Sequence, residues 1–177
     1  MKSICVIGSG ISGSTVANLL SKKYKVDVYE KAKGIGGRSS HRRYLNKLGF
    51  DHGLQYISPK TSKFKKFCSG LQKKRVLKKW QGPHNFDHSK VLENKKHTKL
   101  IGAKGNNAIS KYLLKNINCI FGYELSKIER IRKNWKLSFL NGDVKYYEIL
   151  IISIPFAQSK KLLKKFLPNF FKNKKVK

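Results

Sequence analysis

Apolar and polar positions at the start of the chain predict a strand, a helix and a second strand in direct succession. Residues 2–7 (KSICVI) form an apolar run of the length of one buried strand. From Ile11 the apolar positions recur at helical spacing as far as Leu20, and residues 25–29 (KVDVY) then form a second strand pattern. The chain therefore begins with the pattern of a strand–helix–strand unit.

Helical and strand patterns continue along the rest of the chain. A helix is expected over residues 61–72, where Thr61 or Ser62 can cap its start, and another helix follows Gly105. The dipeptide at 141–142 (NG) predicts a hairpin. Strands are expected over residues 41–45, 76–80, 85–92, 98–105 up to a glycine turn, 117–121, 124–131, 135–140, 143–147 and 149–154. Residues 159–171 form a last amphipathic segment, which Pro168 interrupts.

The turn between the first strand and the helix contains three glycines in the sequence GSGISG. Gly8 lets the chain turn sharply, Gly10 lets the backbone approach a pyrophosphate, and Gly13 lets the helix pack tightly on the strand. The helix begins at Ile11 and Ser12, where free N–H groups and a partial positive charge favour phosphates. This arrangement predicts dinucleotide binding.

An acidic residue stands at the distance that dinucleotide binding requires. Glu30 ends the second strand, twenty positions after Gly10, and its carboxylate can accept hydrogen bonds from a ribose. Two other glycine motifs are excluded by single residues. A P-loop needs Lys directly after the last glycine, where Ser14 stands, and a nucleophile elbow needs one residue between Ser12 and the next glycine.

A second glycine turn follows Lys31 and contains Gly36, Gly37 and Arg38. The glycines allow another close approach of the backbone, and Arg38 can offer a cationic fork to a phosphate. The alternative is a glycine-rich surface loop with a solvated Arg. The turn resembles the GGR motif that follows the ribose-binding acid in flavoproteins of the amine-oxidase superfamily.

The segment GFDHGLQYIS, residues 49–58, sharpens this resemblance. Placed just after GGRSS, it resembles the renalase-like branch of FAD-dependent oxidoreductases. The resemblance implies that Gln55 and Tyr56 lie beside the flavin and that the backbone at Leu125 touches the adenine. The alternative for this segment is a turn with Tyr56 packed in the core.

The resemblance implies an α/β fold with an FAD-type Rossmann (GR2-like) nucleotide-binding domain, a β-meander and part of a second, sheet-based substrate domain. Residues 1–58 would form the FAD-binding βαβ unit and GGR loop, and residues 59–97 a partial excursion into the substrate domain. Residues 98–157 would return to the nucleotide domain, and residues 158–177 would form a basic C-terminal helix or tail. Only the N-terminal portion of the family is matched, so we expect a truncated chain. Three interpretations stay open: a fragment, one half of a split protein whose flavin site a second polypeptide completes, or the product of a decaying gene. Weak dinucleotide binding without catalysis by the chain alone is one expectation from this truncation.

The implied chemistry is hydride transfer to FAD from a small-molecule electron donor, either a reduced nicotinamide nucleotide or an amine-like compound. No catalytic side chain and no metal ligand is expected. Asp51 and His52 are interpreted as a turn Asp and a partly exposed His rather than as a catalytic dyad. The expected cofactor-binding residues are Gly8, Gly10, Ile11, Ser12, Gly13, Glu30, Lys31, Gly37, Arg38, Gln55, Tyr56 and Leu125.

The net charge of +31 favours polyanions, so nucleic-acid binding on a Rossmann scaffold is the alternative function. Nearly all of this charge comes from Lys, in a composition typical of AT-rich coding, and we therefore prefer coding drift as its cause. Cys5, Cys68 and Cys119 have no C-x-x-C spacing and are expected to be buried free thiols. No apolar run is long enough to span a membrane, and a cytoplasmic protein is expected.

Overall fold

The computed structural model describes residues 1–44, 48–81 and 98–172. The chain divides into two compact units. The first consists of Met1–Ile35 together with Leu113–Lys177, and the second of Gly36–Tyr112. The predicted strand at 85–92 lies outside the described residues.

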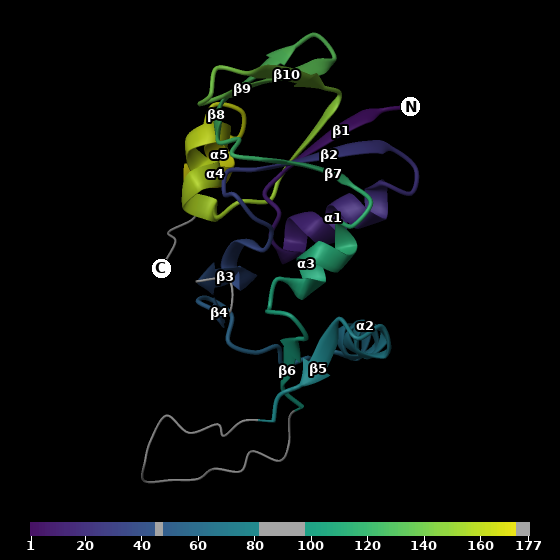
Figure 1. Cartoon of the computed structure of the whole chain (residues 1–177). Helices are drawn as coiled ribbons and strands as arrows, with labels where there is room; N and C mark the ends of the chain where they lie inside the picture. Colours follow the sequence, from purple (N-terminus) through teal and green to yellow (C-terminus); the bar gives the residue numbers. More distant parts are fainter. Residues whose placement is uncertain (45–47, 82–97, 173–177) are drawn as a thin grey trace. The chain divides into compact units, whose positions relative to one another are not determined.

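A four-stranded parallel sheet forms the centre of the first unit (Figure 1). Its strands stand in the order β11 (Ile149–Ile152), β1 (Ser3–Ile7), β2 (Lys25–Glu30) and β7 (Asn118–Phe121). All neighbours run parallel, so the carboxyl ends of β1 and β2 lie at one edge of the sheet. The predicted α/β class with a parallel sheet is confirmed. Ligands of open α/β sheets bind at this edge.

Helix α1 (Ile11–Leu20) packs on this sheet through small residues. Gly13, Ser14 and Ala17 are its buried positions, and Ala17 joins the apolar cluster of Val6 and Val28. Leu19, which the helical pattern included among the apolar positions, is 59% exposed. Small buried side chains let the helix axis come close to the strands, which is what a tight βαβ turn requires.

The β-meander that the sequence predicted is present in the first unit. It consists of β8 (Leu125–Ile131), β9 (Asn134–Phe139) and β10 (Val144–Tyr147), which pair antiparallel in the order β10-β9-β8. The predicted hairpin contains Gly142 at a φ of +89°, a conformation that glycine adopts without strain. Buried residues of the meander pack with residues of β1 and β2 in one core cluster, namely Cys5, Ile7, Tyr29, Leu125, Ile128, Leu137, Phe139 and Tyr147.

The last segment forms two helices rather than one interrupted helix. Helix α4 (Phe156–Leu163) begins directly after Pro155, three residues before the predicted start, and α5 (Pro168–Lys172) begins at Pro168. Proline is tolerated at a helix start because its missing N–H has no partner there. Ser159, expected at the start, instead lies inside α4 and donates to the Phe156 carbonyl at 2.9 Å.

The second unit contains short strands and helices. They are η1 (Gly37–Ser39), β3 (His41–Tyr44), β4 (Leu48–Asp51), α2 (Ser62–Lys73), β5 (Leu77–Lys79), β6 (Leu100–Gly102) and α3 (Ala108–Leu113), whose last residue is counted in the first unit. Strands β3 and β4 pair antiparallel, as do β5 and β6. In the predicted helix α2, Thr61 is the cap and accepts from the Phe64 N–H at 3.3 Å.

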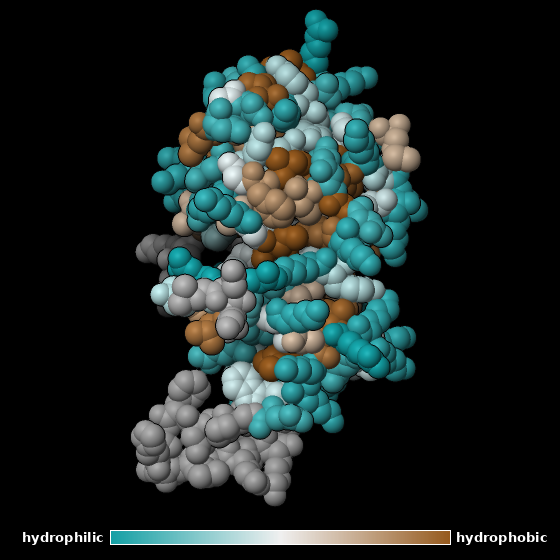
Figure 2. Space-filling model, viewed as in Figure 1, coloured by the Kyte–Doolittle hydropathy of each residue, from teal (hydrophilic) through white to brown (hydrophobic). Residues whose placement is uncertain are grey.

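Cys5 and Cys68 are buried free thiols, as predicted, but Cys119 on β7 is only half-buried. Hydrophilic side chains cover much of the face seen in Figure 2, with apolar groups between them. None of the described helices has both the length and the apolar content that a membrane-spanning helix needs.

Candidate functional site

The glycine turn after β1 is packed so tightly that it excludes side chains. Gly8 has a φ of +101°, and a Cβ added there would lie 2.8 Å from the carbonyl oxygen of Ser153. A Cβ added to Gly13 would overlap the carbonyl oxygen of Gly8 and lie 3.2 Å from the Ser153 hydroxyl oxygen. The first and third glycines therefore have the structural roles predicted for them. Ser153, which follows β11, packs against both Gly8 and Gly13 of this turn.

The start of α1 is left without a side-chain cap. Gly10 is the N-cap residue, with extended backbone (φ −66°, ψ 176°), and it makes no side-chain hydrogen bond to the helix. Its carbonyl accepts from the Ser14 N–H at 2.9 Å, which begins the helical ladder. Ile11 is half-buried and Ser12 is exposed in the first turn, where no acidic residue stands. The free N–H groups of this turn are suited to donate hydrogen bonds to an anionic group, which would then cap the helix.

Glu30, at the carboxyl end of β2, reaches back to the glycine turn. Its Oε2 accepts from the backbone N–H of Ser9 at 2.9 Å and from the Ser9 hydroxyl at 2.8 Å. Its Oε1 accepts from the N–H of Ala32 at 2.9 Å. Ser9 is fully buried and Glu30 is 8% exposed, so the carboxylate has a fixed position beside the turn.

These bonds leave Glu30 with one acceptor position. An ionised carboxylate offers about four lone-pair directions, of which Ser9 and Ala32 occupy three here. The remaining direction belongs to Oε1, the oxygen with a single partner. A ribose hydroxyl could donate a hydrogen bond to Oε1 in this remaining direction. The sequence identified Glu30 but missed Ser9, whose hydroxyl was not distinguished from the other residues of the turn.

Lys31 and Leu125 complete the predicted set in the first unit. Lys31 is exposed and its Nζ lies 3.9 Å from the Glu124 carboxylate. Leu125 begins β8 and is 9% exposed. The backbone beside it approaches β2, because the Tyr123 N–H donates to the Glu30 carbonyl at 3.1 Å. The residues around Leu125 and the end of β2 are thus neighbours.

The GGR turn belongs to the second unit. Gly36 and Gly37 have φ values of +134° and +53°, and a Cβ on Gly36 would lie 2.8 Å from the Asn107 Cβ. Arg38 is exposed, and its carbonyl accepts from the Leu54 N–H at 3.0 Å. The two glycines are therefore required by backbone conformation. The Arg38 guanidinium is on the surface of this unit.

Gln55 and Tyr56 follow β4 in the same unit. Gln55 is exposed, and Tyr56 is half-buried. The Tyr56 ring meets the Trp80 ring edge-on at 5.8 Å between centroids, and Lys99 Nζ lies 4.4 Å from the Tyr56 centroid. A cation over an aromatic face is attracted by the electron-rich ring. Tyr56 thus has partners that its sequence position did not reveal.

Asn106 holds this segment in place, and sequence reasoning missed it. Its side chain is fully buried, accepts from the Gly102 N–H at 2.9 Å and donates to the carbonyls of Leu54 (2.6 Å) and Gln55 (3.1 Å). Its backbone N–H donates to Asp51 Oδ1 at 2.8 Å. In the sequence, Asn106 is simply a polar residue after a glycine turn, as ordinary loops also contain, so its buried bonding role was not predicted.

Asp51 pairs with His41 rather than with its neighbour in sequence. His41 Nδ1 lies 3.0 Å from Asp51 Oδ1, whereas His52 Nε2 lies 2.8 Å from the Ser40 hydroxyl. The interpretation of Asp51 and His52 as something other than a dyad agrees with this geometry. The cross-strand pairing of His41 with Asp51 follows from the register of β3 and β4.

The structure brings together, in the first unit, the two outer glycines of the turn, the start of α1 and the Glu30 carboxylate. This arrangement can hold a phosphate group at the helix start and a hydroxyl-bearing sugar at Glu30. The predicted residues Gly37, Arg38, Gln55 and Tyr56 all lie in the second unit. Within that unit the Leu54 N–H donates to the Arg38 carbonyl, and the Asn106 side chain donates to the Gln55 carbonyl. These hydrogen bonds keep the two segments near one another.

Known proteins resemble this chain in sequence. Residues 6–71 match the model of a family described as NAD(P)-binding Rossmann-like domain. The chain is 25% identical to renalase from Mus musculus over 169 residues, which cover 89% of this chain and 48% of renalase. The chain thus spans about half the length of this relative. The resemblance that the sequence motifs predicted is confirmed.

Solved structures share the fold. The tetracycline destructase Tet(51) superposes with a TM-score of 0.62 at 16% identity, over 92% of this chain and 41% of that chain. A protein from Exiguobacterium sp. 255-15 assigned as a protoporphyrinogen oxidase superposes with a TM-score of 0.71 at 11% identity, over 96% of this chain and 63% of that chain. At these identities the likeness concerns the fold, and it confirms the Rossmann-like α/β architecture.

Proposed function

We propose that this chain is an FAD-binding oxidoreductase domain of the renalase-like type. The electron donor that we propose is a reduced nicotinamide nucleotide or an amine-like compound. The observation that carries the proposal is Glu30, which Ser9 fixes beside the glycine turn with one acceptor direction left over. That direction supports recognition of a ribose hydroxyl. The likeness to renalase, of which the match covers 48%, supports the choice of FAD.

The described residues fit an adenine dinucleotide. At Gly8 and Gly13 the structure has no space for a Cβ, so the turn brings bare backbone to the edge where a pyrophosphate would lie. The α1 start lacks a side-chain cap, and a phosphate could accept from its N–H groups beside Ile11 and Ser12. The first glycine turn, GSGISG, has no cationic side chain, so backbone N–H groups and Glu30 would hold the nucleotide there.

The remaining predicted residues enter the proposal by resemblance. Arg38 is proposed as a phosphate ligand, because its guanidinium is exposed and can offer two parallel N–H donors. Gln55 and Tyr56 are proposed to border the isoalloxazine ring. Lys31 and the Leu125 backbone are proposed to contact the adenosine half, and Gly37 to let the backbone approach a phosphate.

The flavin, when bound, supplies the hydride-accepting chemistry. The chain's own residues bind and orient the nucleotide, and no side chain is assigned a proton-transfer role. Glu30 acts as a hydrogen-bond acceptor, since Ser9 donates to it twice and Ala32 once. Asp51 and His41 bond to each other and take no part in this proposal.

The test is retention of flavin by the purified full chain. The visible spectrum would be recorded before and after incubation with FAD and desalting, and the bands that remain would be compared between variants. Gly10→Val should abolish retention, because a branched side chain would stand where the pyrophosphate must come close. Glu30→Gln should weaken FAD binding about tenfold or more, since an amide offers fewer acceptor directions than a carboxylate and an added N–H₂ donor.

Glu129→Gln on β8 is the matched control. Glu129 is a surface carboxylate whose partners are Lys127 and Lys136, so its loss should leave FAD retention unchanged. Full FAD occupancy in Gly10→Val would refute the assignment of the site. If the wild-type chain binds FAD, anaerobic addition of reduced nicotinamide nucleotides and of amines would show which of them bleaches the flavin bands.

The alternative function, nucleic-acid binding on a Rossmann scaffold, has the net charge of +31 as its support. It predicts that affinity for DNA or RNA falls by about a thousandfold or more between roughly 50 and 200 mM salt. Weak binding without strand preference would favour coding drift. If the chain never retains FAD, the expected second polypeptide would be sought by adding candidate partner chains to the same assay. A cytoplasmic location stays part of the proposal.

A further inference from the structure

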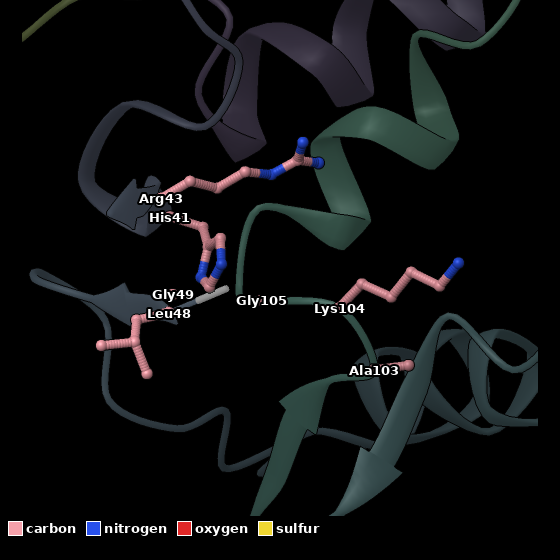
Figure 3. A pocket seen from close by; sticks show the side chains of 7 residues that line it. All are labelled: His41, Arg43, Leu48, Gly49, Ala103, Lys104 and Gly105. Atoms are coloured by element: carbon pink, nitrogen blue, oxygen red, sulfur yellow. The ribbon is translucent and has the colours of Figure 1, made fainter. Parts of the chain in front are cut away.

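A polar hollow of about 390 Å³ lies within the second unit (Figure 3). It is bordered by the β3–β4 ribbon and by the turn that follows β6. Its lining consists of His41, Arg43, Leu48, Gly49, Ala103, Lys104 and Gly105. The hollow shares no residue with the predicted cofactor-binding set.

The register of β3 and β4 creates this space. Alternate residues of a strand share a face, so His41 and Arg43 project from the same side of the ribbon. The residue opposite Arg43 is Gly49, which has no side chain to fill the volume beside the guanidinium stem. A side chain at the position of Gly49 would collide with the His41 ring that forms one wall of the hollow.

The His41 ring forms one wall of the hollow. A Cβ added to Gly49 or to Gly105 would overlap ring atoms of His41, so both glycines pack directly against the imidazole. His41 Nδ1 bonds to Asp51 Oδ1 at 3.0 Å, and the His41 side chain is 16% exposed. The same Asp51 oxygen accepts from the Asn106 N–H. The wall is therefore fixed by contacts on several sides.

Two cationic side chains border the hollow. Arg43 comes from β3 and Lys104 from the turn after β6, and both extend toward the same side of the view in Figure 3. Neither makes an ion pair with a carboxylate of the described residues. Asp51 faces His41 and Asn106 instead. The lining thus has cationic donors and no acidic side chain of its own.

We propose that this hollow binds the phosphate group of a small phosphate monoester or of inorganic phosphate. The Arg43 guanidinium offers a planar fork of N–H donors that matches two phosphate oxygens, and Lys104 adds a point charge. A phosphate dianion carries two negative charges, whereas a carboxylate carries one, so phosphate is the anion that a doubly cationic lining favours. The site goes beyond the proposed oxidoreductase function and does not depend on it.

The experiment is a titration of the full chain with inorganic phosphate and, separately, with phenyl phosphate. Binding is monitored by calorimetry and by phosphorus NMR at a constant ionic strength near 0.15 M. Salt at about this concentration screens the general attraction of a highly basic protein for anions. Acetate serves as the carboxylate probe. The two phosphate arms distinguish a site for the free ion from a site for an ester.

Arg43→Ala and Lys104→Ala should each raise the Kd for the better phosphate ligand about tenfold, as expected when one charge-assisted contact is lost. Arg42→Ala and Lys78→Ala are the matched controls. Arg42 is adjacent in β3 but projects from the other face of the ribbon, and Lys78 is an exposed lysine on β5. All four substituted side chains are exposed, so the variants should fold.

A selective loss in Arg43→Ala and Lys104→Ala, with the controls unchanged, would support the site. Equal losses in Arg42→Ala and Arg43→Ala would overturn it, because binding would then follow the general surface charge. Absence of saturable binding of either phosphate by the wild-type chain would also overturn it. Acetate binding as tight as phosphate binding would overturn the assignment to phosphate.

Discussion

Gly13→Ala should destabilise the first unit, although the same change inside an ordinary helix is stabilising. Gly13 lies in the first turn of α1, is buried, and faces the Gly8 carbonyl. An added Cβ would stand closer than 3.0 Å to that carbonyl oxygen, a separation that real Cβ atoms essentially never show. Because the obstacle is backbone, it cannot move aside as a flexible side chain could.

The expected magnitude combines two opposing effects. Replacing Gly by Ala within a helix gains about 0.5–1 kcal/mol from lower backbone entropy in the unfolded chain. Overpacking in a tightly packed interior costs about 1–3 kcal/mol, and occasionally more where backbone must shift. The α1 helix would have to move away from the turn, so we expect a net loss of about 1–2 kcal/mol. The matched control is Gly70→Ala in α2, where a Cβ would meet nothing within 4 Å and the expected change is a gain of about 0.5 kcal/mol.

The assay is urea unfolding followed by tryptophan fluorescence. The chain has two tryptophans, Trp80 in the second unit and Trp135 in the first, so a Trp80→Phe background makes the signal report on the first unit alone. Gly13→Ala should lower the transition midpoint at an unchanged m-value, which indicates a change in stability rather than in the unfolded state. The reciprocal Trp135→Phe background follows Gly70→Ala. If Gly13→Ala stabilised the first unit as Gly70→Ala stabilises the second, the claim that the turn has no space for a Cβ at Gly13 would be refuted.

Two further predictions concern buried polar groups. Asn106→Leu should destabilise the second unit by at least about 2 kcal/mol, because the Gly102 N–H and the Leu54 carbonyl lose their partner; Trp80 fluorescence in urea measures this. Tyr147→Phe should cost the first unit about 1–2 kcal/mol near neutral pH, since the hydroxyl donates to Asp27 Oδ2 at 2.8 Å. Burial raises the pKa of Tyr147, so its stabilisation is complete below the ordinary tyrosine pKa of about 10 and is lost as pH rises above it; the melting temperature followed against pH should decline less in Tyr147→Phe.

Each of these has an internal control. Tyr146→Phe changes the neighbouring tyrosine of β10, which is 55% exposed, and should alter neither stability nor its alkaline decline. An equal effect of Tyr146→Phe and Tyr147→Phe would contradict the role given to the buried hydroxyl. Asn106→Leu should leave the Trp135 transition of the first unit in place, and a joint loss of both transitions would contradict a local effect.

The first unit could be predicted from sequence because its signals are local. The apolar run of β1, the glycines at 8 and 13, and the spacing to Glu30 each report on neighbours a few residues away or on a recurrent motif. The hairpin at Gly142 was predicted for the same reason. What the sequence left out were the partners: Ser9 bonds to Glu30 across the sheet edge, and Ser153 forms the far side of the turn.

The second unit was harder to predict because its contacts depend on register. His41 and Asp51 meet only if β3 and β4 pair with the observed offset, which alternation alone does not fix. Asn106 binds carbonyls more than fifty positions away in the sequence, and no pattern around it indicates that role. The start of α4 was missed because Pro155 gives a helix start without a polar cap.

The assignment of the cofactor residues and the four-segment division of the chain stay predictions. Their common premise is that the described turn and carboxylate recognise the adenosine and pyrophosphate half of a dinucleotide. FMN contains the same isoalloxazine ring and lacks the adenosine, so it separates this premise from simple affinity for a flavin.

The most direct test is therefore a fluorescence titration of FAD and of FMN with the full chain under identical conditions. We expect saturable binding of FAD and at least about a hundredfold weaker binding of FMN, because FMN lacks the adenosine monophosphate half and with it the contact to Glu30. Adenosine diphosphate should compete with FAD, because it contains the adenosine and pyrophosphate groups that the first unit is proposed to recognise. Equal affinity for FAD and FMN, or FAD binding that adenosine diphosphate cannot displace, would contradict the account.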